Sequence, residues 1–101
     1  MREIDIEGLE SVLADGAALV DVRQPQEYVE ARVPGAVLVP MDQLVSRMHE
    51  LDKDQPVYLI CRVGSRSAAV AEFLTVHGYD AVNVAGGTAA WIRSGRPYDR
   101  G

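Results

Sequence analysis

Cys61 is the only cysteine of the sequence, and the residues around it are suited to nucleophilic chemistry. An apolar run precedes it, and the six residues from Arg62 to Ser67 include two arginines and a glycine. A short loop that curls into the start of a helix points several backbone N–H groups at one place, and the helix dipole adds partial positive charge there. A cysteine in such surroundings has a pKa lowered from its usual value of about 8.5. The segment therefore predicts a thiolate nucleophile that faces an anionic substrate.

The residues of this loop have separate expected parts. Gly64 permits a backbone conformation that a side chain would resist, and Ser65 is a candidate cap for the helix that follows. Arg62 and Arg66 bring full positive charges. The alternative is that Cys61 is a buried packing residue at the end of a strand, because free cysteine is often buried. The two arginines, the glycine and the helix start that follow it favour the reactive thiol.

The elements that must position this loop are predicted by the pattern of apolar residues and turn formers. Strands are expected at 18–22, 36–39, 57–60 and 81–84, with a brief edge strand at 4–6. Helices are expected at 7–14, 25–31, 42–51 and 88–93, the last capped by Thr88, and a further helix follows the Cys61 loop and stops at Gly78. Strands that alternate with helices predict an α/β fold, a five-stranded and mostly parallel sheet with helices on both faces. In such sheets ligands bind outside the carboxyl ends of the strands, and Cys61 stands at that end of strand 57–60.

Length and composition are those of one soluble domain, expected to span residues 1–101. The chain has 101 residues, of which 48% are hydrophobic and 25% charged. Its formal net charge of −5 argues against a nucleic-acid partner or an anionic membrane surface, because both demand clustered cations. The longest apolar run, Val57 to Cys61, has five residues, whereas a membrane span needs about 20. Acidic residues stand near the N-terminus where a secretory signal would be apolar, so a cytoplasmic protein is expected.

Other residues with chemical potential receive structural interpretations. One cysteine cannot form an internal disulfide, and His49 and His77 lie too far from it in sequence to suggest a zinc site. We therefore expect no metal and no cofactor. Trp91 is expected in the core, where its Nε1–H needs a hydrogen-bond partner. Glu27-Tyr28 is expected to hold a short helix in place.

Five segments of the chain resemble, in the same order, segments of the rhodanese homology domain. They are Val20-Asp21-Val22-Arg23 with Glu27-Tyr28, Val33-Pro34-Gly35-Ala36 with Pro40, Cys61 to Ser67, Gly78-Tyr79, and Gly86-Gly87-Thr88-Ala89-Ala90-Trp91. No single segment is specific, whereas five in the right order are, and together they cover nearly the whole chain.

The resemblance implies that Cys61 takes a sulfane sulfur from a small anionic donor such as thiosulfate and passes it on from a persulfide. The substrate-binding residues that it implies are Arg62, Val63, Gly64, Ser65, Arg66 and Ser67. Their backbone amides would surround the persulfide, and Arg66, or else Arg62, would bind the sulfonate of the donor. Asp21 is expected to pair with a loop arginine and hold it in place. Because the chain has no second cysteine, the acceptor must come from outside, as cyanide, a small thiol or a protein thiol.

Ala31-Arg32 departs from the resemblance, since the family usually has Gly-His at this place. Arg32 is either a neutral surface change or a third cation near the mouth of the site. A third cation would tune the site towards a more anionic donor.

Two other functions remain open. Protein tyrosine phosphatases and related enzymes place five residues between cysteine and arginine, so that the loop fits around a phosphate. Counted from Cys61, that position holds Ser67, and Arg66 comes one residue early. The shorter loop counts against a phosphatase or an arsenate reductase. A rhodanese fold can also serve as a non-catalytic interaction module, but loss of the cysteine is the usual sign of that role and Cys61 is present.

Overall fold

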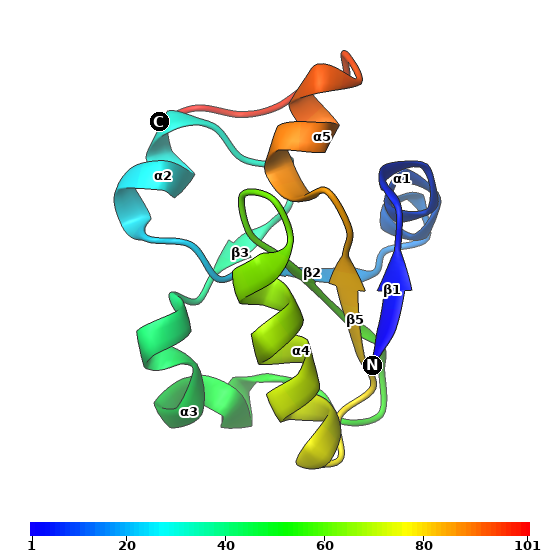
Figure 1. Cartoon of the computed structure of the whole chain (residues 1–101), viewed down its shortest axis with the longest axis vertical. Helices are drawn as coiled ribbons and strands as arrows, with labels where there is room; N and C mark the ends of the chain where they lie inside the picture. Colours follow the sequence, from blue (N-terminus) through cyan, green and yellow to red (C-terminus); the bar gives the residue numbers. More distant parts are fainter.

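A five-stranded parallel sheet forms the centre of the molecule in the computed structural model, which describes residues 1–101 (Figure 1). The strands are β1 (Arg2–Ile4), β2 (Ala18–Asp21), β3 (Val37–Leu38), β4 (Val57–Ile60) and β5 (Ala81–Val84). Their order across the sheet is β1-β5-β4-β2-β3, and every neighbouring pair is parallel. The predicted α/β fold with five strands is therefore confirmed, and the sheet is wholly rather than mostly parallel.

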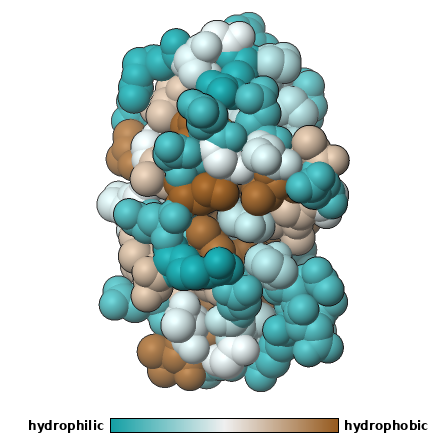
Figure 2. Space-filling model, turned by 90° about the vertical axis from the view of Figure 1, so that its right-hand side faces the viewer, coloured by the Kyte–Doolittle hydropathy of each residue, from teal (hydrophilic) through white to brown (hydrophobic).

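Helices cover both faces of this sheet. They are α1 (Ile6–Ala14), α2 (Pro25–Glu30), α3 (Leu44–Arg47), α4 (Ser65–Val76) and α5 (Gly87–Arg93). None of them is both long and apolar enough to cross a membrane. On the outer side that carries α1 and β1, polar residues predominate and apolar residues form only scattered patches (Figure 2).

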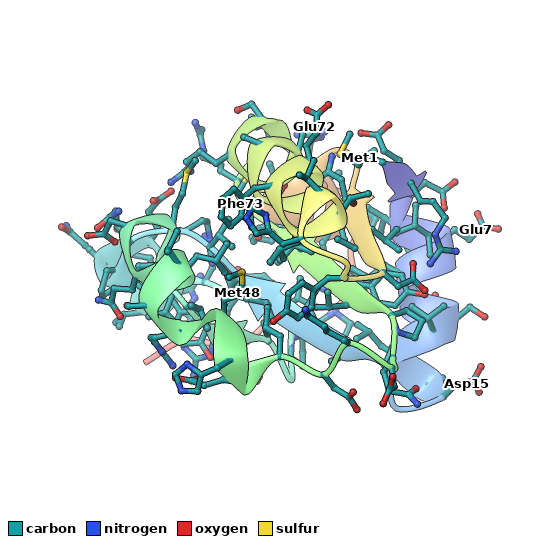
Figure 3. The ribbon with its side chains drawn as sticks, turned by 90° about the horizontal axis from the view of Figure 1, so that it is seen from below. Met1, Glu7, Asp15, Met48, Glu72 and Phe73 are labelled. Atoms are coloured by element: carbon teal, nitrogen blue, oxygen red, sulfur yellow. The ribbon has the colours of Figure 1, made fainter.

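Alternation along β4 divides the core into two halves, because successive side chains of a strand point to opposite faces. Val57, Leu59 and Cys61 pack into the cluster that α3 and α4 cover. Tyr58 and Ile60 pack into the other cluster, which α1 and α5 cover. Cys61 thus continues the strand's apolar face towards α4. On this side, Met48 and Phe73 occupy the space between α3 and α4 (Figure 3).

Two predicted elements differ most from those observed, and the strand expected at 36–39 is shorter, at Val37–Leu38. The first strand ends at Ile4 rather than Ile6, because Asp5 caps α1 by accepting a hydrogen bond from the Gly8 N–H at 2.8 Å. The helix expected at 42–51 is a short α-helix between two 3₁₀ turns, Met41–Gln43 and Met48–Glu50. Only one residue of this segment is buried, and a helix with so little packed surface has little to keep it regular.

The C-terminal part of the chain folds back over α5 and α2. Trp91 is buried, and its Nε1–H donates to the Pro97 carbonyl at 2.8 Å, which confirms the expected core position and hydrogen-bond partner. The hydrogen bond therefore joins the end of α5 to the segment that follows it.

Candidate functional site

The loop between β4 and α4 wraps around the sulfur of Cys61. Its Sγ accepts hydrogen bonds from the Gly64 N–H at 3.2 Å, the Ser67 N–H at 3.4 Å and the Ser67 hydroxyl at 3.3 Å. Cys61 is 0% exposed. The cysteine is therefore buried, as the packing alternative would have it, but its sulfur is surrounded by hydrogen-bond donors rather than by hydrocarbon alone.

These donors act on the charge of the thiol. Burial raises the pKa of Cys61, since the anion loses its hydration, but the hydrogen bonds from the Ser67 hydroxyl and N–H lower it. The N–H groups of Gly64 and Val63 lower it further, and the net result is a pKa below that of an ordinary cysteine. The loop therefore favours the thiolate.

Gly64 is the residue that lets the loop close. Its φ of +110° lies in the left-handed region that favours glycine, and it is the N-cap of α4. The expected capping role of Ser65 is wrong, because Ser65 is the first helical residue. The sulfur takes the place of a capping side chain, since the N–H groups at this helix start point at it.

The start of α5 holds the other side of the loop. The Thr88 N–H and hydroxyl both donate to the Cys61 carbonyl, at 2.9 and 3.1 Å, and the Ala89 N–H donates to the Arg62 carbonyl at 3.0 Å. Thr88 is thus not the cap of α5, which begins at Gly87 after the N-cap Gly86. The loop backbone is fixed from both ends, by α4 and by α5.

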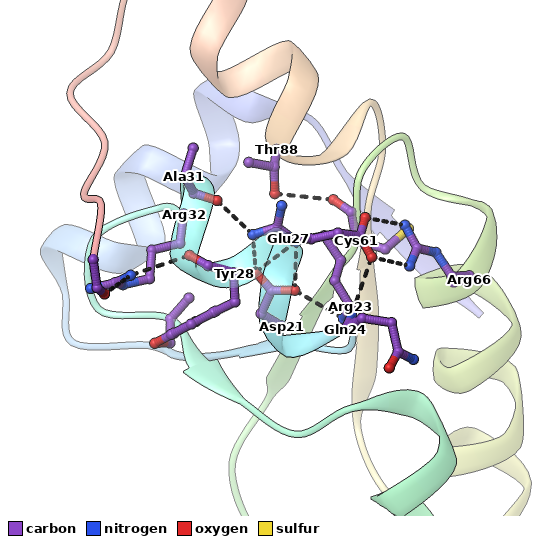
Figure 4. Close-up of polar contacts among 12 residues, drawn as sticks. Asp21, Arg23, Gln24, Glu27, Tyr28, Ala31, Arg32, Cys61, Arg66 and Thr88 are labelled. Atoms are coloured by element: carbon purple, nitrogen blue, oxygen red, sulfur yellow. Dashed lines mark hydrogen bonds and ion pairs between the residues drawn. The ribbon is translucent and has the colours of Figure 1, made fainter.

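Arg66 is held by a carboxylate from α2. Its Nη1 and Nη2 donate to Glu27 Oε1 and Oε2 at 2.8 and 2.9 Å, a two-point ion pair that Figure 4 shows. The Arg66 hydrogen bonds lower the pKa of Glu27 from 4.5 to about 2, and the same contact raises the pKa of Arg66. The pair therefore ties α4 to α2 beside the sulfur.

This pair makes the stability of the protein depend on pH in a defined window. The folded pKa of Glu27 lies below its unfolded value, so the contribution is complete above about pH 4.5 and is lost as the pH falls towards 2. Both side chains are about one-third exposed, and solvent screening reduces the effect to about 1 kcal/mol. We expect Glu27→Gln to lower the free energy of unfolding by about 1 kcal/mol near pH 7 and by about a quarter of that near pH 2.5.

Urea unfolding at the two pH values measures this difference. Glu30→Gln is the matched control, because Glu30 is exposed on the same helix and forms no ion pair. An equal loss for Glu27→Gln at both pH values would show that the ion pair is not its cause.

A second, fully buried ion pair lies at the end of β2. Arg23 Nη2 donates to Asp21 Oδ2 at 2.8 Å, and its Nε donates to Oδ1 at 2.9 Å. The side chains are 5% and 0% exposed, and Arg23 also donates to the Ala31 carbonyl (Figure 4). The expected pairing of Asp21 with a loop arginine is therefore wrong. Arg23 stands two residues away and takes both carboxylate oxygens, while Glu27 takes Arg66.

Arg32 is not a third cation at the mouth of the site, so that expectation is wrong. Its guanidinium lies 4.6 Å from the centre of the Tyr28 ring and donates to the carbonyls of Tyr28 and Gly101, at 3.2 and 2.8 Å. Its backbone pairs with Asp99. Arg32 therefore fastens the C-terminal segment to α2, and it does not line the cavity at the site.

That cavity has a volume of about 440 Å³ and lies between α2, the start of the loop and α5. Its lining residues are Arg23, Glu27, Glu30, Ala31, Arg62, Thr88, Ala89, Ile92 and Arg93. Arg62 and Arg93 are exposed and have no carboxylate within ion-pair distance. The cavity therefore offers two cations without ion-pair partners next to the loop, together with the unpaired carboxylate of Glu30.

Two polar residues of the site, Asn83 and Arg23, were not assigned a role from the sequence. Asn83 of β5 accepts from the Ser67 hydroxyl at 2.6 Å and donates to Glu3 at 2.8 Å. Arg23 was seen only as part of a motif. A polar residue inside a strand of buried apolar residues is the signal that identifies Asn83, since a buried amide must be hydrogen-bonded. No group of three or more histidine, cysteine or acidic side chains is placed to hold a metal ion.

Comparisons with known proteins find relatives over nearly the whole chain. The family model of the rhodanese-like domain matches residues 6–94. A protein of Allochromatium vinosum named sulfurtransferase is 41% identical over 100 residues, which cover 96% of this chain and 94% of the relative. The structure of a rhodanese-related protein from Thermoplasma volcanium has a TM-score of 0.92 at 31% identity and covers 98% of both chains.

A thiosulfate sulfurtransferase of Pseudomonas aeruginosa is also similar, with a TM-score of 0.90 and 26% identity over all of this chain and 20% of that one. The chain belongs to the rhodanese-like domain family. Relatives named sulfurtransferase, together with the single cysteine, support sulfurtransferase activity in general.

Proposed function

We propose that this protein transfers a sulfane sulfur from a small anionic donor such as thiosulfate to an external acceptor through a persulfide on Cys61. The observation that carries the proposal is the set of three donors around Sγ, which lowers the pKa of the thiol at the carboxyl end of a central parallel strand. A thiolate is the nucleophile that this chemistry requires, and a preformed one needs no separate general base.

The first step is attack of the Cys61 thiolate on the outer sulfur of thiosulfate. The new S–S bond forms as the bond between the two thiosulfate sulfurs breaks, and sulfite leaves with the electron pair. The negative charge of the enzyme then resides on the outer persulfide sulfur, near the amides of the loop. Because Cys61 is 0% exposed, the atoms that cover Sγ must move before the donor can reach it.

The two arginines of the loop have different parts in binding the donor. Both terminal nitrogens of Arg66 are occupied by Glu27, so Arg66 positions the loop and supplies a partly neutralised charge. Arg62 lines the cavity without a carboxylate partner. We therefore assign the sulfonate of the donor to Arg62.

We expect Arg62→Ala to raise the KM for thiosulfate about tenfold, the loss of roughly one charge-assisted hydrogen bond, with a smaller effect on kcat. Steady-state kinetics at two salt concentrations measure it, because the contribution of an exposed cation falls with ionic strength. Arg100→Ala is the matched control, since Arg100 stacks on Tyr98 away from the cavity. A change in kcat alone would contradict the assignment.

The second step is attack of an external nucleophile on the outer persulfide sulfur, which restores the thiolate. Cyanide, a small thiol or a protein thiol meets the requirement, and no cysteine of this chain is available to do so. The proposed cycle uses no metal and no cofactor.

Intact mass spectrometry tests the proposal. After incubation with thiosulfate, the protein should gain about 32 Da, the mass of one sulfur atom, and sulfite should appear in solution. Cyanide should remove the added mass and yield thiocyanate, and Cys61→Ser should show neither change. Absence of the adduct with thiosulfate and with persulfide donors would overturn the proposal.

The structure favours no second candidate function. For phosphate-ester hydrolysis, the loop position of the arginine is filled by Ser67, whose hydroxyl bonds to the sulfur, and Arg66 is committed to Glu27. Turnover of a phosphate ester that disappears in Cys61→Ser would be evidence for a phosphatase activity.

A further inference from the structure

The hydroxyl of Ser67 has one proton and three acceptors within reach. They are Asn83 Oδ1 at 2.6 Å, Cys61 Sγ at 3.3 Å and the Gly64 carbonyl at 3.3 Å. Ser67 is 0% exposed and Asn83 2% exposed, so no bulk water satisfies an acceptor that is left over. The acceptors therefore compete, and the shortest contact is the one with Asn83.

The fold determines which end of the Asn83 amide faces Ser67. Asn83 Nδ2 donates to Glu3 Oε2 at 2.8 Å, and the two residues are direct partners in the pairing of β1 with β5. A carboxylate only accepts hydrogen bonds, so it must face the NH₂ group of the amide. The Asn83 oxygen is thereby directed at Ser67, where it can only accept.

We propose that Asn83 is a positioning residue that alternates with the sulfur of Cys61 as the acceptor of the Ser67 hydroxyl. While Cys61 is a thiol, Ser67 donates to Asn83 Oδ1, and the S–H group donates to a lone pair of Ser67 Oγ. When Cys61 ionises, its proton leaves to solvent, and the Ser67 hydroxyl rotates to donate to the thiolate. The Ser67 proton stays on its own oxygen throughout.

The consequence for sulfur transfer rests on the proposed function. Once a persulfide forms, the negative charge lies on the outer sulfur and Sγ is neutral. The Ser67 hydroxyl then donates to Asn83 Oδ1 again, so the hydrogen bond of the amide oxygen is restored. Asn83 therefore favours the thiol and the persulfide relative to the bare thiolate, because only the thiolate leaves a buried amide oxygen unsatisfied.

Other charged groups surround the site, and the proposal does not alter them. Arg66 with Glu27 lies on α4 and α2, and the Asp21–Arg23 pair lies at the end of β2. Arg62 lies in the loop and Arg93 on α5, both at the cavity, and Glu3 lies on β1. Of these groups only Glu3 is hydrogen-bonded to Asn83, and it loses that contact when Asn83 is replaced. The Ser67→Ala background separates this loss from an effect transmitted through Ser67, because the contact with Glu3 does not involve Ser67.

Ultraviolet absorbance of the thiolate as a function of pH tests the proposal, with each variant measured against the same variant carrying Cys61→Ser. Asn83→Val removes the competing acceptor and keeps a side chain suited to a strand. The titration midpoint should fall, and the thiolate fraction at a pH below the midpoint should rise about threefold. Ser67→Ala should shift the midpoint in the opposite direction. In the Ser67→Ala background, Asn83→Val should have no further effect.

A higher midpoint in Asn83→Val, or the same shift in the Ser67→Ala background, would overturn the proposal. If Asn83→Val does not fold, the infrared S–H stretch of the wild-type protein below the midpoint decides. A single cysteine gives a single band, expected at the lowered frequency of an S–H donor and returning towards that of a free thiol in Ser67→Ala. An S–H stretch at the frequency of a free thiol in the wild-type protein would refute the proposal. Neither measurement requires sulfur transfer, so the persulfide test can fail or succeed independently.

Discussion

Asp21→Ala is expected to lower the free energy of unfolding by about 3–5 kcal/mol, the usual cost of leaving one charge of a buried ion pair unpaired. The Arg23 guanidinium would remain in a site where it is only 5% exposed, with just the Ala31 carbonyl still accepting from it. Urea unfolding followed by circular dichroism measures the loss. A protein of this size is stable by only about 5–15 kcal/mol, so the variant should be near its limit at 37 °C.

The double variant Asp21→Leu/Arg23→Met separates charge from packing. It removes both charges and retains most of the buried volume, and replacement of a buried ion pair by apolar residues is often neutral. We expect it to recover most of the stability that Asp21→Ala loses. If Asp21→Ala cost less than about 1 kcal/mol, the pair would be solvated rather than buried.

Gly87→Ala should reduce sulfur transfer by about 100-fold or more, because misplacement of a catalytic group by about 1 Å has that effect. The φ of Gly87 is +60°, and an added Cβ would lie 2.5 Å from the Arg62 carbonyl oxygen and 2.6 Å from that of Cys61. Both contacts are with backbone atoms, so the loop itself must move. The sulfur and the loop amides would then lose their alignment.

Gly95→Ala is the matched control for this variant. Gly95 also has a positive φ, +83°, but nothing lies within 4 Å of a Cβ built on it. Gly95→Ala should therefore lower the free energy of unfolding by about 1–2 kcal/mol, from the backbone conformation alone, and leave the rate of sulfur transfer unchanged. Equal loss of activity in the two variants would contradict the claim that α5 shapes the loop. Thiosulfate turnover and thermal unfolding of both variants supply the comparison.

The central features of the fold could be predicted because they depend on local sequence patterns. The apolar run at β4 is short, rich in β-formers and followed by a loop, and it lies in the middle of the sheet with all four residues buried. The position of Cys61 at the carboxyl end of this strand follows directly. Gly64 could be assigned its conformation for the same reason, since the requirement for a positive φ is local.

The sequence could not predict which carboxylate pairs with which arginine, because ion pairing depends on distances between elements. Asp21 and Glu27 stand six residues apart, and both are plausible partners for a loop arginine. Asp21 is the carboxylate at the end of β2, but Arg23 follows it closely enough to occupy both its oxygens. Glu27 reaches Arg66 only because α2 packs beside the start of α4, a contact between residues 39 positions apart.

The parts that Gly87 and Asn83 play in the site could not be predicted from the sequence for a related reason. The Gly86-Gly87 pair predicts a turn, but not that the turn lies against the carbonyls of the Cys61 loop. Asn83 becomes meaningful only once β1 pairs with β5 and brings Glu3 beside it. In both positions the sequence shows an unusual residue, and the three-dimensional structure shows what it contacts.

The pH titration of the Cys61 thiol in the wild-type protein tests the electrostatic basis of the site most directly. With Cys61→Ser as the reference, the ultraviolet signal of the thiolate belongs to one residue only. We expect half-ionisation at a lower pH than for cysteine in an unfolded peptide, about 8.5, because three donors converge on the sulfur. Half-ionisation at or above that pH would mean that burial outweighs those donors and that the protein does not hold a ready nucleophile.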